Sequence, residues 1–451
     1  MKLTDNARVA IIGGGPAGSM AGFFLLELAQ RIELNLTVDL YEPRDFSRYG
    51  PPGCNMCAGV VSESLVQTLA AEGIELPPEV VQRGIDSYTL HTTDLPEVSI
   101  NTPADDLRIA TIYRGNGPRI PAGKSLWESF DGYLLALAED RGVNIIPKRV
   151  TDLGWEGNLA KVSCADEPDK TYDLLIGAVG VNAPILKRFS ELGFAFSPPP
   201  VKKGFLSEIY LGESVVQEYL GSSMHIFLLD IPGLKFAALI PKVEYVTISL
   251  MGEGIDKRLV ERFMNTPEVR RCLPDWVEWS YKDKTEGVGQ ACFCGPKLNV
   301  GPAVKPYGNR VVMIGDCAVS RLYKDGIGAA YITAKASAVT ALFFGICNDD
   351  FKDHYGPICQ RIARDNVIGN LIFFVTVFYQ KLQLLRGGMV RMVMEEKDRE
   401  EDERRMSRVL WDTFTGSATY REIFFNSIHP VFVFRLFMAT LRSFFSRPKR
   451  G

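Results

Sequence analysis

The sequence has almost no excess of charge of either sign. Its 451 residues carry 51 basic and 54 acidic side chains, so the formal net charge is only −3. This balance gives no general attraction to nucleic acid, and no basic motif that reads DNA or RNA is present, so we expect no nucleic-acid partner. The first residues lack the pattern of a secretory signal. With nine cysteines and no signal, we expect a cytoplasmic protein with reduced thiols.

Long apolar runs are scarce as well. An apolar block of the C-terminal quarter, residues 368–379, is shorter than the roughly 20 residues of a spanning helix. We therefore expect no membrane-spanning segment. Internal repeats are absent, and no second glycine-rich dinucleotide motif follows a strand, so we expect no resident NAD(P) domain.

The clearest positive signal lies in residues 8–42. An apolar run that predicts a buried strand leads into glycines with the spacing G-x-G-x-x-G, at Gly13, Gly15 and Gly18. These positions suit a tight turn, a close approach of the backbone to a pyrophosphate, and close packing of helix on strand.

The segment behind this turn predicts a helix that begins at Pro16 and Ala17 and directs its N-terminal amides at the phosphates. A second apolar strand ends at Glu42, where a carboxylate can accept the ribose hydroxyls. Arg44 and Arg48 follow, where they could meet phosphate or flavin oxygens, with a solvated role as the alternative. Strand, turn, helix, strand and acid in this order predict a dinucleotide site rather than a plain turn.

The α/β pattern returns in residues 308–345. An apolar strand ends at Gly315 and Asp316, which places Asp316 at the carboxyl end of a parallel strand, where ligands collect in such sheets. Gly326 and Gly328 then stand at the start of a helix and let the backbone approach a ligand. The alternative is a capping aspartate with ordinary glycines.

Cysteines occur as a C-x-x-C at Cys54 and Cys57 and as a C-x-C at Cys292 and Cys294. Four thiolates could bind zinc, but the spacing of a zinc ribbon is missing, so we expect no metal here. A second alternative is a redox role, in which Cys54 and Cys57 cycle between the dithiol and the disulfide form.

Several segments together resemble the geranylgeranyl reductase family of FAD-dependent oxidoreductases, within the wider group of aromatic-hydroxylase-like flavoproteins. These segments are GGGPAG, Glu42, CAGVVSESL, GAVG and GDCAVSRLYKDGIGAAYITAKASA. The resemblance covers residues 8–345 and implies FAD as the cofactor.

The resemblance also implies a place on FAD for each motif. The first motif and Glu42 bind the ADP half, and Gly315 with Asp316 contacts the ribityl–pyrophosphate part. Cys57-Ala58-Gly59 with Ser62 is similar to the C-G-G-G-x-S loop beside the flavin. The residues implied along the isoalloxazine ring are Gly326, Ile327 and Gly328.

The sequence departs from the family pattern at three places. Val179 replaces the aspartate of G-A-D-G, Trp127 stands where the family has an arginine ahead of Phe-Asp, and Ala238 replaces a tryptophan in the aromatic-rich stretch. FAD binding is little affected by these changes, whereas they weaken the prediction of prenyl-chain reduction.

The fold that follows is α/β: a discontinuous Rossmann-like FAD-binding domain, an antiparallel-sheet substrate domain, and a helical C-terminal region. The alternating runs that predict the antiparallel sheet lie within residues 185–300. The predicted FAD-binding parts are 1–84, 116–184 and 301–345, the substrate-domain parts are 85–115 and 185–300, and the helical region is 346–451.

The helical region combines charge and apolar aromatic surface. Residues 386–408 are dominated by charge and predict a solvated helix or loop. The last block places aromatic residues beside basic ones, which is typical of a helix in a membrane interface, with core packing or a dimer contact as the alternative. Its residues are Phe432, Phe434, Phe437, Phe444, Phe445, Arg442, Arg447, Lys449 and Arg450.

The function predicted first is reduction of C=C bonds of a lipophilic, isoprenoid-type substrate by hydride from reduced FAD. NAD(P)H or a reduced carrier protein would supply electrons, and the enzyme would be peripheral on the cytoplasmic face of the membrane. Cys57 and Tyr323 are candidate proton donors by position, with plain packing as the alternative. The rival functions are a flavin-dependent monooxygenase of a small aromatic substrate and a non-catalytic flavin-binding membrane adaptor.

Overall fold

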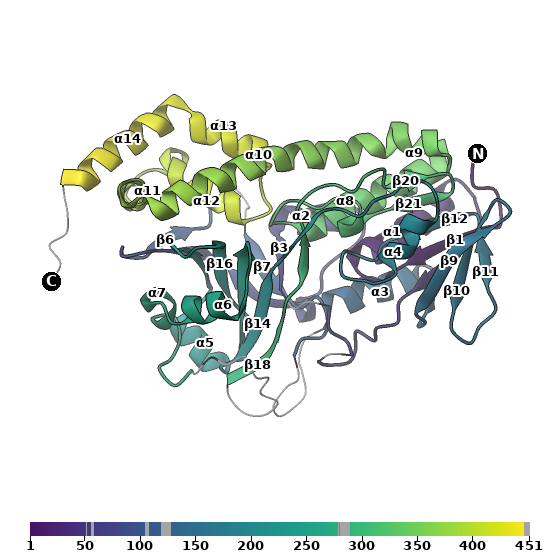
Figure 1. Ribbon diagram of the computed structural model, residues 1–451, viewed down its shortest axis with the longest axis horizontal. Helices are drawn as coiled ribbons and strands as arrows, with labels where there is room; N and C mark the ends of the chain where they lie inside the picture. The colour runs from purple at the N-terminus through teal and green to yellow at the C-terminus, as the bar shows by residue number, and fades with distance from the viewer. Residues whose placement is uncertain are drawn as a thin grey trace.

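A computed structural model describes residues 1–50, 52–55, 58–103, 108–118, 128–277, 279 and 289–445 of the chain. Two large sheets follow one another along the length of the molecule, and a layer of helices runs along one edge of both (Figure 1). The described chain ends with a helix at the far end of this layer, away from the N-terminus.

The first sheet has six strands in the order β20-β21-β12-β1-β2-β8, parallel except for β20. Its strands are β1 Ala7–Ile12, β2 Leu36–Tyr41, β8 Asn144–Ile146, β12 Leu174–Gly177, β20 Tyr307–Gly308 and β21 Val311–Met313. The helices packed on one of its faces are α1 Pro16–Arg31, α3 Phe130–Asp140 and α8 Gly326–Val339, and side chains from residues 150–196 pack on the other face. Val9, Ile11 and Leu174 are fully buried beneath these helices. Strands of a parallel sheet are buried on both faces and are therefore almost entirely apolar, as these strands are. The predicted Rossmann-like fold is confirmed.

The second large sheet has seven strands in the order β18-β14-β17-β16-β15-β5-β6. Its bounds are β5 Ser87–Thr92, β6 Val98–Asn101, β14 Phe205–Tyr210, β15 Ser223–Leu228, β16 Leu234–Pro241, β17 Tyr245–Gly252 and β18 Gly289–Cys294. The pairs are antiparallel except β15 with β5, which are parallel. Strands β5 and β6 therefore join the later strands β14 to β18 in one sheet, which is the predicted antiparallel sheet of the substrate domain.

The remaining strands and short helices lie outside the two large sheets. The small strands are β3 Gly59–Ser62, β4 Val81–Ile85, β7 Ile109–Ile112, β9 Val150–Glu156, β10 Leu159–Cys164, β11 Lys170–Tyr172, β13 Val201–Lys203 and β19 Lys297–Asn299. The short helices are α2 Glu63–Ala71, α4 Leu186–Glu191, α5 Glu213–Tyr219, α6 Lys257–Met264 and α7 Pro267–Arg270. The strand β7 pairs with β3 and β4 in a separate three-stranded sheet rather than with β5 and β6.

The C-terminal region is helical, as predicted. Its helices are α9 Asn348–His354, α10 Gly356–Lys381, α11 Gln383–Glu396, α12 Arg405–Phe414, α13 Tyr420–Ile428 and α14 Pro430–Phe445. Helices α11 and α12 cover one face of the seven-stranded sheet, where Trp411 stacks on Tyr88 with ring centroids 4.6 Å apart. Helices α5, α6 and α7 cover the opposite face.

The expectation that residues 386–408 are a solvated segment holds only for part of it: Lys397, Asp398 and residues 400–402 are exposed, whereas most of helix α11 is packed. Helix α11 lies between the sheet and α14, and both Arg386 and Glu396 are buried. The Glu396 carboxylate accepts hydrogen bonds from the amides of Met406 and Ser407, both at 2.9 Å, at the start of α12. The first amides of a helix have no partner within it, and a buried carboxylate satisfies them here.

The expectation of no helix long and apolar enough to span a membrane is wrong. Two helical stretches among the described residues meet that length and composition: 326–344 with mean hydropathy 1.4, and α10 with mean hydropathy 1.3. The bent pair of α13 and α14, at 64°, is a third candidate. A search for one uninterrupted apolar run misses these helices, because a single polar residue ends a run but lowers the mean hydropathy of a long helix only slightly. The 326–344 stretch is mostly buried inside the protein, whereas only 22% of the apolar part of α10 is.

Candidate functional site: a cavity at the carboxyl ends of the parallel strands

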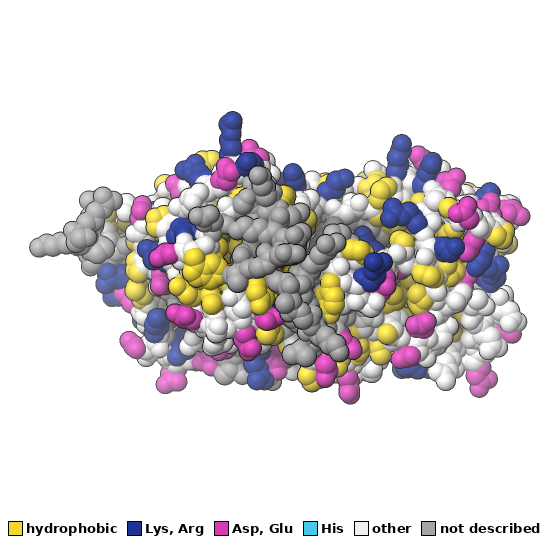
Figure 2. All heavy atoms as spheres, turned by 90° about the horizontal axis from the view of Figure 1, so that it is seen from below, with side chains coloured by type: hydrophobic (Ala, Val, Ile, Leu, Met, Phe, Trp, Pro, Cys, Tyr) yellow, Lys and Arg dark blue, Asp and Glu magenta, His cyan; other side chains and the backbone are white. Residues whose placement is uncertain are grey.

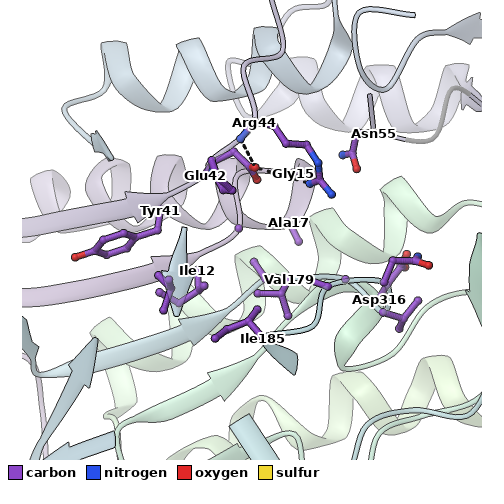
Figure 3. Close-up of a pocket in the computed structure, with 18 of the residues that line it drawn as sticks. Ile12, Gly15, Ala17, Tyr41, Glu42, Arg44, Asn55, Val179, Ile185 and Asp316 are labelled. Atoms are coloured by element: carbon purple, nitrogen blue, oxygen red, sulfur yellow. Dashed lines mark hydrogen bonds and ion pairs between the residues drawn. The ribbon is translucent and has the colours of Figure 1, made fainter. Parts of the chain in front are cut away.

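A cavity of about 670 Å³ opens where β1, β2 and β12 end and α1 begins. Figure 3 shows Gly15, Glu42 and Arg44 on one side of it and Val179 and Asp316 on another. A parallel sheet places its ligand at this edge, because the strands end there and helix N-termini point toward it.

The glycine turn shapes the wall of this cavity. Gly13 has a φ of +106°, which favours glycine, and a Cβ on Gly18 would lie 1.8 Å from the carbonyl oxygen of Gly13. A Cβ on Gly15 would instead meet nothing closer than Asn55 Nδ2, at 3.7 Å. Two glycines therefore serve the chain's own packing, while Gly15 leaves room on the cavity side for a ligand to approach the backbone.

Helix α1 directs its N-terminus into the cavity. Pro16 and Ala17 of its first turn line the wall, none of the described side chains caps this end, and the first turn carries no acidic residue. The free amides and the helix dipole favour a bound anion. This arrangement suits a pyrophosphate.

Glu42, at the end of β2, is buried in the same wall. Its Oε2 accepts a hydrogen bond from the Gly14 amide at 2.8 Å, and its Oε1 accepts one from the Arg44 amide at 2.9 Å. Figure 3 marks the contact with Arg44 by a dashed line. A carboxylate oxygen accepts more than one hydrogen bond, so Glu42 can still accept ribose hydroxyls.

A buried ion pair closes the cavity near Gly15, and the sequence did not reveal it. Arg114 donates through Nε to Asp131 Oδ1 at 2.7 Å and through a terminal nitrogen to Oδ2 at 3.2 Å. Asn55 donates to the same carboxylate. Burial raises the pKa of Asp131, and the guanidinium of Arg114 opposes that rise. The sequence shows the acid, in the dipeptide Phe130-Asp131, but the arginine that pairs with it comes from a different segment. The family has its arginine at the position of Trp127, which lies outside the described residues.

The second motif forms the other side of the cavity. Asp316 faces it from a short 3₁₀ turn, Gly315–Cys317, and Gly326 and Ile327 line it at the start of α8. Gly315 lies behind this wall, where its amide donates to Thr333 Oγ1 at 2.9 Å. Gly328 likewise does not line the cavity.

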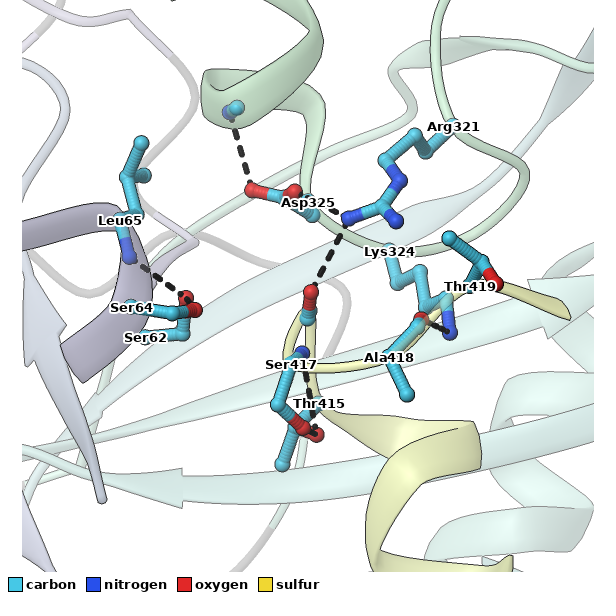
Figure 4. A network of polar contacts seen from close by, with 12 residues as sticks. Ser62, Ser64, Leu65, Arg321, Lys324, Asp325, Thr415, Ser417, Ala418 and Thr419 are labelled. Atoms are coloured by element: carbon cyan, nitrogen blue, oxygen red, sulfur yellow. Dashed lines mark hydrogen bonds and ion pairs between the residues drawn. The ribbon is translucent and has the colours of Figure 1, made fainter. Parts of the chain in front are cut away.

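Gly328 belongs to the cap of α8. Its amide donates to Asp325 Oδ1 at 2.9 Å, and Asp325 also pairs with Arg321 at 2.6 Å. Arg321 donates as well to the carbonyl of Gly416, and Lys324 Nζ donates to the carbonyl of Ala418 at 2.8 Å (Figure 4). The loop in front of α8 is thus held by the C-terminal region.

Two predicted residues lie away from the cavity. Arg48 is exposed and is not among the described residues that line it. Tyr323 packs between Phe236 and Phe373, with ring centroids 6.0 and 5.1 Å away, and burial raises its pKa to about 12.

The cysteine motifs are only partly described. Cys57 lies outside the described residues, and Cys54 is half-buried. Burial raises the pKa of Cys294 to about 12, and nearby Cys54 adds to this rise. The loop of Cys54 therefore lies near strand β18.

No family model matches the chain. A geranylgeranyl diphosphate reductase from Synechocystis sp. is 23% identical over 358 residues, which are 74% of this chain and 74% of the relative. A flavoprotein/dehydrogenase from Cytophaga hutchinsonii has a TM-score of 0.60 at 16% identity, covering 97% of this chain and 100% of its own.

Other flavin enzymes share the architecture. A flavin-dependent brominase has a TM-score of 0.59 at 14% identity over 90% of this chain and 99% of its own. A p-nitrophenol 4-monooxygenase from Pseudomonas putida has a TM-score of 0.60 at 11% identity over 92% and 98%. The chain has the fold of the FAD-dependent oxidoreductases. The predicted family and the predicted cofactor, FAD, both agree with these flavoprotein relatives.

Proposed function

We propose that this FAD-dependent oxidoreductase reduces C=C bonds of a lipophilic, isoprenoid-type substrate at a membrane surface. The observation that carries the proposal is an apolar face on three C-terminal helices of a flavoprotein fold. The outward residues of α10 on this face are Val367, Leu371, Phe374, Val375 and Phe378, and the residue that follows this helix, Leu382, is exposed as well. Those of α13 and α14 are Phe425, Ile428, Val431, Val433, Phe434, Phe437, Leu441, Phe444 and Phe445.

The residues present fit FAD. The N-terminus of α1 with Gly15 would hold the pyrophosphate, and Glu42 would hold the ribose of the adenosine. Asp316 would hold the ribityl side, with Gly326 and Ile327 along the ring. Bound and reduced FAD would supply a hydride to one carbon of the double bond, and a proton added at the neighbouring carbon would complete the reduction. The chain's own work is to orient the substrate and exclude water.

The apolar face supports a membrane as the source of the substrate. Residues 367–380 of α10 contain no charged side chain, while Arg361, Arg364 and Lys381 flank them. Apolar residues with basic flanks fit the interface of an anionic bilayer. By contrast, basic and acidic side chains are interspersed on the opposite side of the molecule (Figure 2).

Helix α10 is better suited to lie in the interface than to cross the bilayer. Its inner side is tied to the protein, because Phe373 stacks on Phe236 with ring centroids 5.7 Å apart and Asn366 donates to the Ser320 carbonyl at 2.7 Å. A helix that is apolar on one side and anchored on the other lies in the plane of the interface. We therefore propose a peripheral or monotopic enzyme on the cytoplasmic face.

A monooxygenase of a small aromatic substrate is the second candidate. The similarity in fold to the p-nitrophenol 4-monooxygenase supports it, whereas the apolar face has no role in that chemistry. A single pair of measurements separates the two. Protein reduced under anaerobic conditions should be reoxidised by a polyprenyl diphosphate, and NADPH-driven oxygen uptake should not rise with phenols. The reverse result contradicts the reductase. No reoxidation by the polyprenyl diphosphate together with no phenol-dependent oxygen uptake supports the non-catalytic adaptor.

A further inference from the structure

Three side chains with metal-binding atoms meet inside the second domain, far apart in the sequence. His91 lies on β5, His225 on β15, and Cys272 just behind α7. His91 Nε2 lies 2.9 Å from His225 Nδ1, and Cys272 Sγ lies 3.3 Å from His225 Nδ1 and 3.7 Å from His91 Nε2. We propose that these three residues bind a zinc ion.

The distances suit this assignment. Zinc binds imidazole nitrogen at about 2.0–2.1 Å and thiolate sulfur at about 2.3 Å, so donor atoms around a tetrahedral ion lie roughly 3.3–3.7 Å apart. All three donor atoms lie within 4.8 Å of one another, and only the two ring nitrogens must separate by a few tenths of an ångström. Three protein ligands leave one coordination position for water.

The surroundings also favour an ion over a purely hydrogen-bonded cluster. The chain has only four histidines, and two of them are buried here, among apolar residues such as Phe227 and Phe263. Imidazole nitrogen and thiolate sulfur are ligands that zinc prefers, and the cluster supplies both.

Zinc binds the neutral form of imidazole and the deprotonated form of a thiol. Binding of Zn²⁺ would form the Zn–S bond and release the thiol proton to solvent.

The site is separate from the cofactor cavity, since it shares no lining residue with it among the described residues. It lies on the face of the seven-stranded sheet that is covered by α6 and α7. A zinc ion here would fasten α7 to strands β5 and β15. We assign it a structural role, because it contacts no residue of the proposed reaction.

The test uses the purified, FAD-loaded full chain, stripped of metal by a chelator and titrated with Co²⁺ as a spectroscopic probe for zinc. We expect a thiolate-to-cobalt charge-transfer band that saturates at one ion per chain, and about one zinc per chain after titration with Zn²⁺ alone. The absence of the band in the wild type overturns the proposal, whatever the variants do.

Variants then assign the ligands. Cys272→Ser and His225→Gln should each abolish the charge-transfer band and lower the zinc content at least tenfold. Cys359→Ser and His354→Gln are matched controls, since Cys359 is a buried thiol and His354 an exposed histidine, both outside the cluster. Equal loss in the controls, or a band retained in Cys272→Ser, contradicts the assignment. Should the variants fold poorly, the wild-type titration alone decides.

Discussion

Arg114 and Asp131 form a bidentate ion pair at the wall of the cofactor cavity, opposite the open side of Gly15. A Cβ on Gly15 would lie 3.9 Å from the Arg114 guanidinium and 4.0 Å from the Asp131 carboxylate. The pair links the loop after β7 to the first turn of α3, and so closes the space that a pyrophosphate would occupy.

Removing the arginine should destabilise the fold. Arg114→Leu leaves the fully buried carboxylate of Asp131 without its counter-charge, which should cost roughly 3–5 kcal/mol in the free energy of unfolding. Urea denaturation measures this cost. Arg108→Leu is the matched control, because the Arg108 side chain in its pair with Glu63 is 69% exposed, and its loss should cost about 1 kcal/mol or less. A similar loss of unfolding free energy in both variants would show that the buried ion pair stabilises the fold no more than the exposed one.

Gly15→Val should give a folded but colourless protein. The added side chain would enter the space in front of α1 and push a pyrophosphate away from the helix amides. Flavin absorbance per chain after purification measures the effect. Gly84→Val is the control, since a Cβ there meets nothing within 4 Å. Full flavin content in Gly15→Val would contradict the proposed position of the pyrophosphate.

Asp316→Ala should weaken retention of FAD while the remaining holoprotein keeps a reduced rate. The carboxylate is expected to position the cofactor rather than transfer a proton. Flavin release during gel filtration and the turnover per bound flavin are to be measured separately. Asp316→Asn, which keeps the shape, should retain more flavin than Asp316→Ala. Full flavin occupancy with complete loss of turnover would instead assign Asp316 a direct chemical role.

Lys324 should make stability depend on pH. Burial lowers its pKa from 10.5 to about 7, so between these values the unfolded chain holds a proton that the folded chain lacks. The free energy of unfolding should therefore rise from pH 7 toward 10, by at most about 1.4 kcal/mol per pH unit from this group. Lys324→Met should lose this slope in urea melts at several pH values, whereas Lys187→Met, at an exposed lysine, should keep it. Equal slopes in all three proteins would refute the assignment.

The apolar face should bind anionic vesicles. Phe374→Glu combined with Phe434→Glu removes two exposed aromatic anchors, each worth about 1.5 kcal/mol or more when buried, so partitioning should fall by about 100-fold or more. Flotation with phosphatidylserine-containing vesicles measures this, and flavin content should not change. Val304→Glu, at an exposed apolar residue outside the face, is the control.

The same experiment separates the membrane from a second copy of the chain. If the wild type does not float with vesicles, and the double variant turns a dimer into a monomer in light scattering, the face is a dimer contact. Deletion of residues 430–451 is a poorer test than these substitutions, because α14 also packs on α11. Its residues Phe432 and Ala439 are buried there.

The cofactor half of the molecule was predictable because its signals are local. The turn at Gly13 and the helix behind it depend on residues next to one another in the chain, and so does the strand that ends at Glu42. Such elements have the same form in any protein that folds a parallel sheet around them. The sequence alone therefore determined the α/β fold and the edge of the sheet at which a dinucleotide would lie.

Only the tertiary structure brought together the residues that converge from distant segments. Arg114 meets Asp131, and His91 meets His225 because β5 and β15 pair in one register, with His91 opposite Phe227. A shift of that register by one residue would turn each side chain to the other face of the sheet. The burial of Glu396 and the outward face of α10 likewise depend on which helix packs against which surface. Strand register and helix packing are set by contacts across the whole core, and no local pattern specifies them.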